Sequence, residues 1–277
     1  MWNADLIINL CRQASDIAFR YYDDPPMELK SDDSVVTAAD KQVEAFLTEH
    51  LTSDGSSFIG EETCELRGED YIRRALEAES CYVVDPIDGT APYSCHFPAW
   101  GHSIGLMSRG RLTDGAIYLP VQDVLFVTDG PDVRLVRNLR SGEYRNEVFR
   151  FESPGIDLRR PVAVAQKFVK TRNLTLKNQV FCWSACLAGC EYLLLGKLMA
   201  YVAVVKLWDI AAAGAIFDRL GIVGFNEHGK KFELDVNSEF YDLDPASPDR
   251  FRLRDATCFA AGEEICRHVF AHIPPEA

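Results

Sequence analysis

Apolar residues in the first part of the chain recur at two spacings. Residues 4–22 and the segment that begins at Thr37 carry them three and four positions apart, which predicts two helices that each bury one face. Thr37 is the expected start of the second helix, with Asp40 three residues later as its partner in a capping box. Shorter apolar runs at 57–60 and 81–85 predict strands, and acidic residues stand at their ends.

The pattern changes after residue 100. Short apolar runs separated by Gly, Asp and Pro occupy residues 101–151 and predict an antiparallel meander. Beyond it, strands are expected near 162–165, 179–183, 199–205, 221–225 and 257–262, and helices over 184–196, over 208–220 and from residue 263. The polar stretch 62–80 is expected to be a mobile loop or a surface helix. This order predicts an α/β (α+β) sandwich in one domain, 1–277, with an N-terminal lobe 1–155 and a C-terminal lobe 156–277.

The chain is acidic, with a formal net charge of −13 and no basic run. This charge argues against binding to nucleic-acid polymers or membrane surfaces, and it favours small ligands or metal cations as partners. The N-terminus shows no basic segment followed by an apolar core, and no apolar run reaches the ~18 residues that a membrane span needs. We therefore expect a cytoplasmic protein.

The nine cysteines are odd in number and form no C-x-x-C pair, so a disulfide framework is not expected. Cys182, Cys186 and Cys190 are spaced four residues apart and are expected to form one stripe of a helix. Such a stripe is either a soft-metal site or a set of small residues that face the core. We prefer the second interpretation, because buried cysteine behaves as a small apolar residue.

A carboxylate-rich turn follows the strand expected at 81–85. Asp85 and Asp88 are three residues apart in "DPIDGT", and a tight turn can aim both carboxylates at one hard cation such as Mg²⁺. The carbonyl of Ile87 can join them, and the backbone amides of Gly89 and Thr90 can face a phosphate. The alternative is a turn whose aspartates cap their own backbone, which is common.

Two more segments place acids in similar surroundings. Glu61 and Glu62 end the apolar run at 57–60, and Asp209 follows Trp208 at the start of an apolar helix. Each has an ordinary alternative, a solvated loop for the glutamates and a first-turn acid for Asp209. The occurrence of all three segments in one chain favours a shared metal site.

Together, "GEE" at 60–62, "DPIDGT" at 85–90 and "WDIAAAG" at 208–214 resemble the inositol monophosphatase family of metal-dependent, lithium-sensitive phosphomonoesterases. The stretch "SVVTAADKQVEAFL" at 34–47 is similar to the segment that precedes the family's first acidic motif. The resemblance implies a layered α-β-α-β-α sandwich of the sugar-phosphatase type, a single phosphatase domain that is usually a homodimer. It also implies two or three Mg²⁺ ions per active site.

The resemblance further implies roles for single residues. Thr90 and Glu61 would be catalytic by orienting the water that attacks phosphorus, Asp40 would support Thr90, and Glu62 would assist a third, weaker metal. The implied metal ligands are Glu61, Asp85, Asp88, Asp209 and the carbonyl of Ile87. The implied substrate-binding residues are Asp88, Gly89, Thr90, Ser184, Ala185 and Asp209. This chemistry needs no thiol or imidazole, so structural roles are expected for Cys95, His96 and His102.

Departures from the family's pattern leave the substrate open. Val202 stands where members that act on inositol phosphates often have a glutamate that binds ring hydroxyls, and valine has no hydrogen-bonding group. The expected activity is hydrolysis of a small phosphate monoester, inositol 1-phosphate or a similar sugar or polyol phosphate, by water that Mg²⁺ activates. Alternatives are a 3′(2′),5′-bisphosphate nucleotidase, a histidinol-phosphatase, or a non-catalytic member that binds a metal or a partner.

Overall fold

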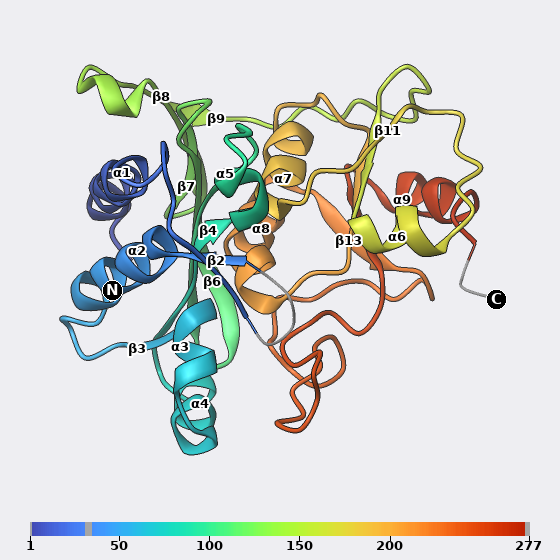
Figure 1. Cartoon of the computed structure of the whole chain (residues 1–277). Coiled ribbons are helices and arrows are strands. Elements are labelled where there is room, and N and C mark those ends of the chain that lie inside the picture. Colours follow the sequence, from blue (N-terminus) through green and yellow to red (C-terminus); the bar gives the residue numbers. More distant parts are fainter. Residues whose placement is uncertain (1, 31–34, 275–277) are drawn as a thin grey trace.

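A computed structural model describes residues 2–30 and 35–274 of the 277-residue chain (Figure 1). Its helices are α1 (Ala4–Phe19), α2 (Ala38–Leu51), α3 (Glu61–Leu66), α4 (Glu69–Leu76), α5 (Thr90–Ser94), α6 (Gln166–Thr171), α7 (Cys186–Leu194), α8 (Leu207–Leu220) and α9 (Glu263–Phe270). Its strands are β1 (Met27–Leu29), β2 (Val35–Thr37), β3 (Ser57–Gly60), β4 (Cys81–Asp88), β5 (Gly101–Ser108), β6 (Arg111–Leu119), β7 (Val124–Asp129), β8 (Asp132–Arg137), β9 (Arg145–Phe149), β10 (Val162–Val164), β11 (Val180–Phe181), β12 (Ala200–Ala203), β13 (Val223–Asn226) and β14 (Thr257–Ala260).

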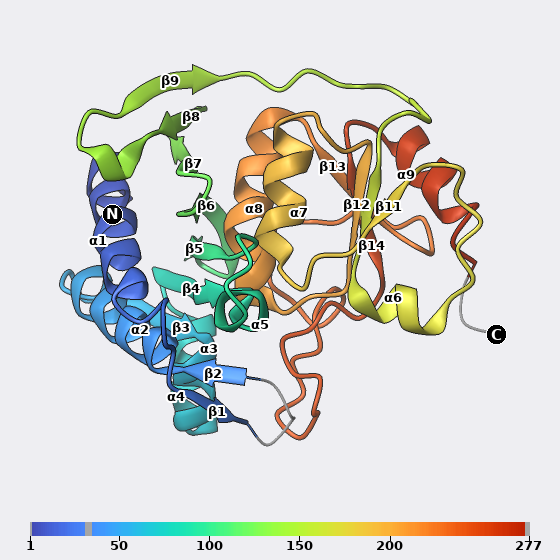
Figure 2. The same ribbon diagram turned by 45° about the horizontal axis from the view of Figure 1, so that its top comes forward.

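These elements form five layers. Helices α1 and α2 cover one face of a seven-stranded sheet, and α7 and α8 lie between that sheet and a five-stranded one, whose far side carries α6 and α9 (Figures 1 and 2). The strand order is β3-β4-β5-β6-β7-β8-β9 in the first sheet and β11-β10-β12-β14-β13 in the second. The layered α/β sandwich expected from the sequence is therefore confirmed.

The antiparallel meander expected over 101–151 is also present. Strands β5 to β9 pair in sequence order and antiparallel, whereas β3 and β4 are parallel. The first sheet ends at Phe149 and the second begins with β10 at Val162. The division into lobes at residue 155 stays a prediction, since both sheets contact the same middle layer, α7 above all.

Of the two alternatives for the stretch 62–80, a mobile loop or a surface helix, the helical one is confirmed, because α3 and α4 occupy most of it. Two other local expectations need revision. Helix α1 ends at Phe19, before the end expected at residue 22. The cysteine stripe is wrong for Cys182, which is exposed ahead of α7, whereas Cys186 and Cys190 are buried in that helix. All nine cysteines lie in the described residues and are free.

Small residues let α8 approach the seven-stranded sheet closely. A Cβ at Gly115 of β6 would overlap the carbonyl oxygen of Ala212 in α8, so only glycine fits between the two backbones. The Ser103 hydroxyl on β5 donates to the carbonyl of Trp208 at 2.8 Å, which fixes the first turn of α8 against the sheet. This packing places Asp209, the next residue, beside the end of β4.

In residues 2–30 and 35–274, no helix has both the length and the apolar character needed to cross a lipid bilayer.

Candidate functional site

Three acidic side chains converge where β4 ends and α8 begins. Oxygens of Asp85, Asp88 and Asp209 all lie within 4.8 Å of one another. The pairing of β4 with β5 is irregular between Asp85 and Asp88, and such a bulge re-aims side chains that regular alternation would separate. Asp85 and Asp88 are buried, at 2% and 5% relative exposure.

Backbone amides hold two of these carboxylates. The amides of Cys186 and Leu187 donate to Asp88 at 2.9 and 2.7 Å, which ties the end of β4 to the first turn of α7. The amide of Lys206 donates to Asp209 at 2.9 Å. In contrast, Oδ1 of Asp85 is buried and finds no hydrogen-bond partner in the described part of the chain. A buried carboxylate oxygen without a donor is unfavourable unless a cation approaches it.

Burial and mutual repulsion disfavour charge on the cluster. Burial, with Glu61 and Asp209 nearby, raises the pKa of Asp85 well above its usual range. Burial and Asp209 raise the pKa of Asp88 to about 8, and burial and Glu61 raise that of Asp209 to about 6. A divalent cation would reverse these shifts. An all-oxygen donor set with one unpartnered oxygen therefore fits a hard ion such as Mg²⁺.

Glu61 and Glu62 begin α3, directly after β3, and their carboxylates meet a lysine. Lys30 Nζ lies 3.1 Å from Oε1 of Glu61 and 2.7 Å from Oε1 of Glu62, and it also pairs with Glu65 at 3.1 Å. Burial acts to lower the pKa of Lys30, but the ion pairs outweigh it and raise that pKa. Glu61 thus lies outside the group of three in the described residues, yet it is near enough to raise the pKa of Asp85.

Thr90 and Asp40 are in direct contact. The Thr90 hydroxyl lies 3.0 Å from Oδ1 of Asp40 and 3.1 Å from the carbonyl oxygen of Ile87, and it can donate its one hydrogen to either acceptor. Asp40 also accepts from Thr37, in the capping box expected at the start of α2. With its hydrogen so engaged, the Thr90 oxygen keeps its lone pairs for another donor, such as water.

Gly89 joins β4 to α5 in a conformation that favours glycine. Its φ is +84°, and a Cβ there would lie 2.7 Å from the carbonyl oxygen of Ala99 and 2.8 Å from the Cβ of Ala185. The backbone of residues 88–90 therefore passes close to the segment that carries Ser184 and Ala185.

A cavity of about 430 Å³ opens beside the carboxylates. Asp88, Asp209, Ser184 and Ala185 all line it, so four of the six expected substrate-binding residues share one space. Val202 does not line this cavity. Its side chain is buried in the core between the five-stranded sheet and helices α6 and α9.

His102 supports the turn rather than lining the cavity. It is fully buried, with Nδ1 2.5 Å from the carbonyl oxygen of Pro86, and burial lowers the pKa of its imidazole to about 4. The neutral ring therefore donates from Nδ1 to that carbonyl. Neither this contact nor the Lys30 ion pairs had a signal in the sequence, because a single histidine in a strand and a single lysine in a polar stretch form no motif.

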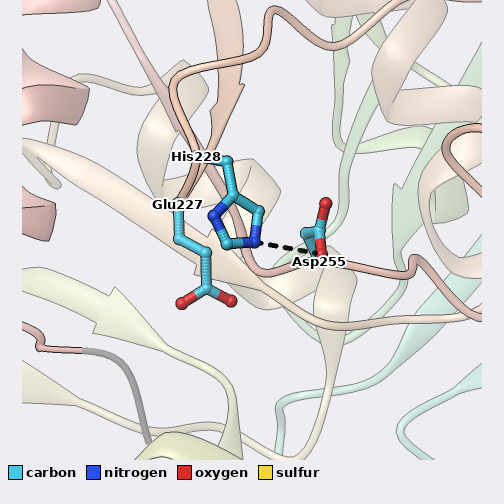
Figure 3. Close-up of side chains that lie close together, drawn as sticks. All are labelled: Glu227, His228 and Asp255. Carbon is cyan, nitrogen blue, oxygen red and sulfur yellow. Dashed lines mark ion pairs between the residues drawn. The ribbon is translucent and has the colours of Figure 1, made fainter.

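A second group of possible ligands lies apart, in the segment after β13 (Figure 3). The exposed His228 ring faces Asp255, with Nε2 3.6 Å from Oδ1. Glu227, the third member, is paired with Arg172 through both oxygens, at 2.7 and 3.2 Å. The arginine already neutralises that carboxylate, so the group is a weaker candidate for a cation than the three aspartates.

Comparisons with known proteins identify the family to which the chain belongs. A sequence model of the inositol monophosphatase family matches residues 4–242. The Nus factor SuhB of Pasteurella multocida is 28% identical over 228 residues, which cover 78% of this chain and 82% of that protein. Inositol monophosphatase 3 of Solanum lycopersicum is 27% identical over 240 residues, which cover 83% of this chain and 88% of that protein.

Solved structures share the fold. An IMPase of Thermotoga maritima matches with a TM-score of 0.71 at 16% identity, covering 96% of this chain and 97% of that one. An IMPase/NADP phosphatase complexed with Mg²⁺ and phosphate also matches with a TM-score of 0.71 at 16% identity, covering 96% of this chain and 92% of that one. With the family match over most of its length, this chain belongs to the inositol monophosphatase family.

Proposed function

We propose that this protein is a Mg²⁺-dependent phosphomonoesterase that hydrolyses a small phosphate monoester, inositol 1-phosphate or a similar sugar or polyol phosphate. The observation that carries the proposal is the meeting of Asp85, Asp88 and Asp209 beside a cavity of about 430 Å³. The relatives named inositol monophosphatase, and the solved structure with Mg²⁺ and phosphate, support the same assignment.

The proposed ligands of two or three Mg²⁺ ions are Asp85, Asp88, Asp209, Glu61 and the carbonyl of Ile87. Lys30 pairs with Oε1 of Glu61, and we assign Oε2 of Glu61 to the metal. Held by these residues, Mg²⁺ would supply positive charge for the phosphate oxygens and the leaving alkoxide and would lower the pKa of a water molecule. Glu62, whose pKa burial raises to about 7 against the effect of Lys30, would assist the third ion.

The remaining residues position the reactants. Thr90 holds its hydrogen toward Asp40 or the Ile87 carbonyl, so its oxygen accepts a hydrogen bond from the attacking water and, with Glu61, orients it. The backbone amides of Gly89 and Thr90 would hold the phosphate. Ser184 and Ala185, which line the cavity, would face the alcohol part of the ester.

The proposal also covers the oligomeric state of the protein, its location and its inhibition. By analogy with the family, we propose a cytoplasmic homodimer that lithium inhibits. A 3′(2′),5′-bisphosphate nucleotidase and a histidinol-phosphatase use the same chemistry and remain alternatives for the substrate.

A non-catalytic, partner-binding role is the alternative of another class. The relative named as a Nus factor favours it. The buried aspartates disfavour it, because carboxylates that repel one another destabilise a fold that has no cation to bind.

The test is phosphate release from a panel of inositol, sugar, nucleotide and histidinol phosphates, with and without Mg²⁺. Asp85→Asn and Asp209→Asn should each lower kcat/KM about 100-fold or more, because each removes a charge that holds the metal. Asp218→Asn is the matched control, since Asp218 is exposed on the same helix as Asp209. Failure of every ester to give Mg²⁺-dependent phosphate release would sink the proposal.

A further inference from the structure

A buried tyrosine lines the cavity beside the three aspartates. The cations that line this cavity are Lys167, Lys170 and Arg252, which are exposed or half-buried. Two aromatic side chains line it as well: Trp183, which is half-buried, and Tyr201, which is 4% exposed. A hydrogen-bond donor that is shielded from water is the more effective one, because water does not compete for its partner. The phenol of Tyr201 is such a donor.

Helix α7 determines where this phenol lies. Tyr201 belongs to β12, and its ring crosses α7 at Gly189, where a Cβ would lie 2.8 Å from Cδ2 and Cε2 of the ring and 3.0 Å from Cζ. Cys186 lies three residues before Gly189, on the same side of the helix, and its thiol is a hydrogen-bonding neighbour of the Tyr201 hydroxyl. The hydroxyl is therefore directed along α7 toward the first turn of that helix.

The first turn of α7 also holds one of the aspartates. The amides of Cys186 and Leu187 donate to Asp88 at 2.9 and 2.7 Å. A phenol directed to this turn, on the wall of the same cavity, lies at the end of the cavity where the aspartates meet.

The Tyr201 hydroxyl keeps its hydrogen in this position. Burial raises the pKa of Tyr201 well above its usual range, and the thiols of Cys186 and Cys190 and the carboxylate of Asp88 act in the same direction. Sulfur is a weak acceptor, so the hydrogen remains available to a stronger one. The oxygen of a bound molecule at this end of the cavity would be such an acceptor.

We propose that the Tyr201 hydroxyl donates a hydrogen bond to the leaving oxygen of the ester. This inference rests on the proposed function. With the reacting phosphate at the three aspartates and the alcohol part in the rest of the cavity, the oxygen that joins them lies at the aspartate end, beside this hydroxyl.

The reaction leaves Tyr201 unchanged. Water bonds to phosphorus as the bond from phosphorus to the leaving oxygen breaks, and the leaving oxygen takes the electron pair of that bond. The proton that the product alcohol gains comes from the water, and Tyr201 keeps its own. Its hydrogen bond stabilises the negative charge that develops on the leaving oxygen in the transition state.

The size of the effect should depend on the leaving group. Removing one donor to a developing oxyanion lowers kcat about 100-fold or more in sites that depend on it. A metal ion would share the charge here, so we expect about a tenfold loss for an ester of an aliphatic alcohol. The anion of 4-nitrophenol is stable without a donor, so its phosphate ester should lose much less.

The experiment compares Tyr201→Phe with Tyr241→Phe in the full-length protein with Mg²⁺. Both tyrosines are buried in the same core, and Tyr241 does not line this cavity. With an aliphatic ester that the protein cleaves, such as inositol 1-phosphate, Tyr201→Phe should lower kcat about tenfold and change KM less than about twofold, because the contact forms in the transition state. With 4-nitrophenyl phosphate its kcat should change less than about twofold. Tyr241→Phe should leave both substrates unaffected.

Three results would overturn the inference while hydrolysis by the parent protein still supports the proposed function. They are an unchanged kcat in Tyr201→Phe, an equal loss of kcat for both esters, and a change confined to KM. Thermal unfolding checks that Tyr201→Phe is folded, as expected for a variant that keeps the ring over Gly189. If the parent protein cleaves no ester, the proposed function fails and this inference fails with it, since no leaving oxygen exists.

Discussion

Neighbouring residues of β5 hold the two segments that carry the aspartates. Ser103 donates to the Trp208 carbonyl at the start of α8, and His102 donates to the Pro86 carbonyl in the turn between Asp85 and Asp88. Successive side chains of a strand point to opposite faces of the sheet. The two contacts therefore anchor helix and turn from different sides, and one strand fixes their relative position.

Ser103→Ala tests this anchoring. The substitution leaves the Trp208 carbonyl without its buried donor, so the free energy of unfolding should fall by about 1–2 kcal/mol. Because Asp209 follows Trp208, Mg²⁺ affinity should also fall about tenfold, an effect typical of residues that orient ligands. Urea unfolding measures the first effect, and Mg²⁺ titration of the thermal midpoint measures the second.

Ser108→Ala is the control for this experiment. Ser108 lies on the same strand and donates to the Glu79 carbonyl at 3.2 Å, far along the strand from the aspartates. It should not change Mg²⁺ affinity. Equal Mg²⁺ affinities for the two variants would show that the Ser103 contact does not position Asp209.

At the residue scale, the sequence predicts the acids better than their partners. Asp85, Asp88 and Asp209 stand at the ends of apolar runs, and strand ends and first helical turns are where polar side chains meet at the edge of a core. Lys30 and His102 could not be identified in this way. Their partners are distant glutamates and a backbone carbonyl, and nothing in the local sequence reports either.

At the scale of elements, the closeness of α8 to the sheet decides where Asp209 lies. Gly115→Ala should destabilise the fold by about 1–3 kcal/mol, because its Cβ would overlap the Ala212 carbonyl and force the helix outward. Gly214→Ala, within α8 itself, is the matched control. Its Cβ would come no nearer than 3.4 Å to Leu234, and alanine favours helix, so stability should stay equal or rise slightly.

Thermal and urea unfolding measure the difference in stability between these two variants, and Mg²⁺ titration shows whether Asp209 has moved. If Gly115→Ala is as stable as the parent protein, the close approach of α8 to the sheet does not contribute to stability.

Elements with a clear apolar period could be predicted from the sequence, and the others could not. The strands of the meander and the long helices α1, α2 and α8 are largely buried, so the spacing of their apolar residues is visible in the sequence. Strand β1 is exposed along its whole length, with Leu29 72% exposed, and therefore shows no alternation. The helix predicted over 184–196 begins two residues before α7, and Cys182 lies ahead of that helix, because no glycine or proline marks the boundary at Cys186.

At the scale of the whole molecule, net charge indicates the class of partner but not where charges gather. The value of −13 does not reveal that three acids meet inside the protein or that cations line the adjacent cavity. Those facts depend on how the middle layer, α7 and α8, brings segments from both halves of the chain together. That arrangement is set by packing between distant segments, which local patterns do not report.

The buried acids make stability depend on pH in a direction that Mg²⁺ should reverse. The pKa of Asp88 is raised to about 8 and that of Glu191 to about 7, both mainly by burial, whereas unfolded Asp and Glu have pKa values of about 4. At pH values between about 4 and 8, these carboxyl groups therefore keep protons in the folded protein that they have released in the unfolded chain. Metal-free stability should therefore fall as pH rises toward 8, by at most about 1.4 kcal/mol per pH unit for each proton.

The window from pH 6.5 to 8 isolates this effect. His102 acts in the opposite direction, because its folded pKa of about 4 lies below its unfolded value, but its contribution changes only below about pH 6.5. Chemical denaturation of the metal-free protein should show lower stability at pH 8 than at pH 6.5. Saturating Mg²⁺ binds the deprotonated carboxylates, so its stabilisation should be larger at pH 8, and Asp209→Asn should reduce that difference. If Mg²⁺ stabilised the protein equally at both values, the aspartates would not be the groups that release protons to the metal.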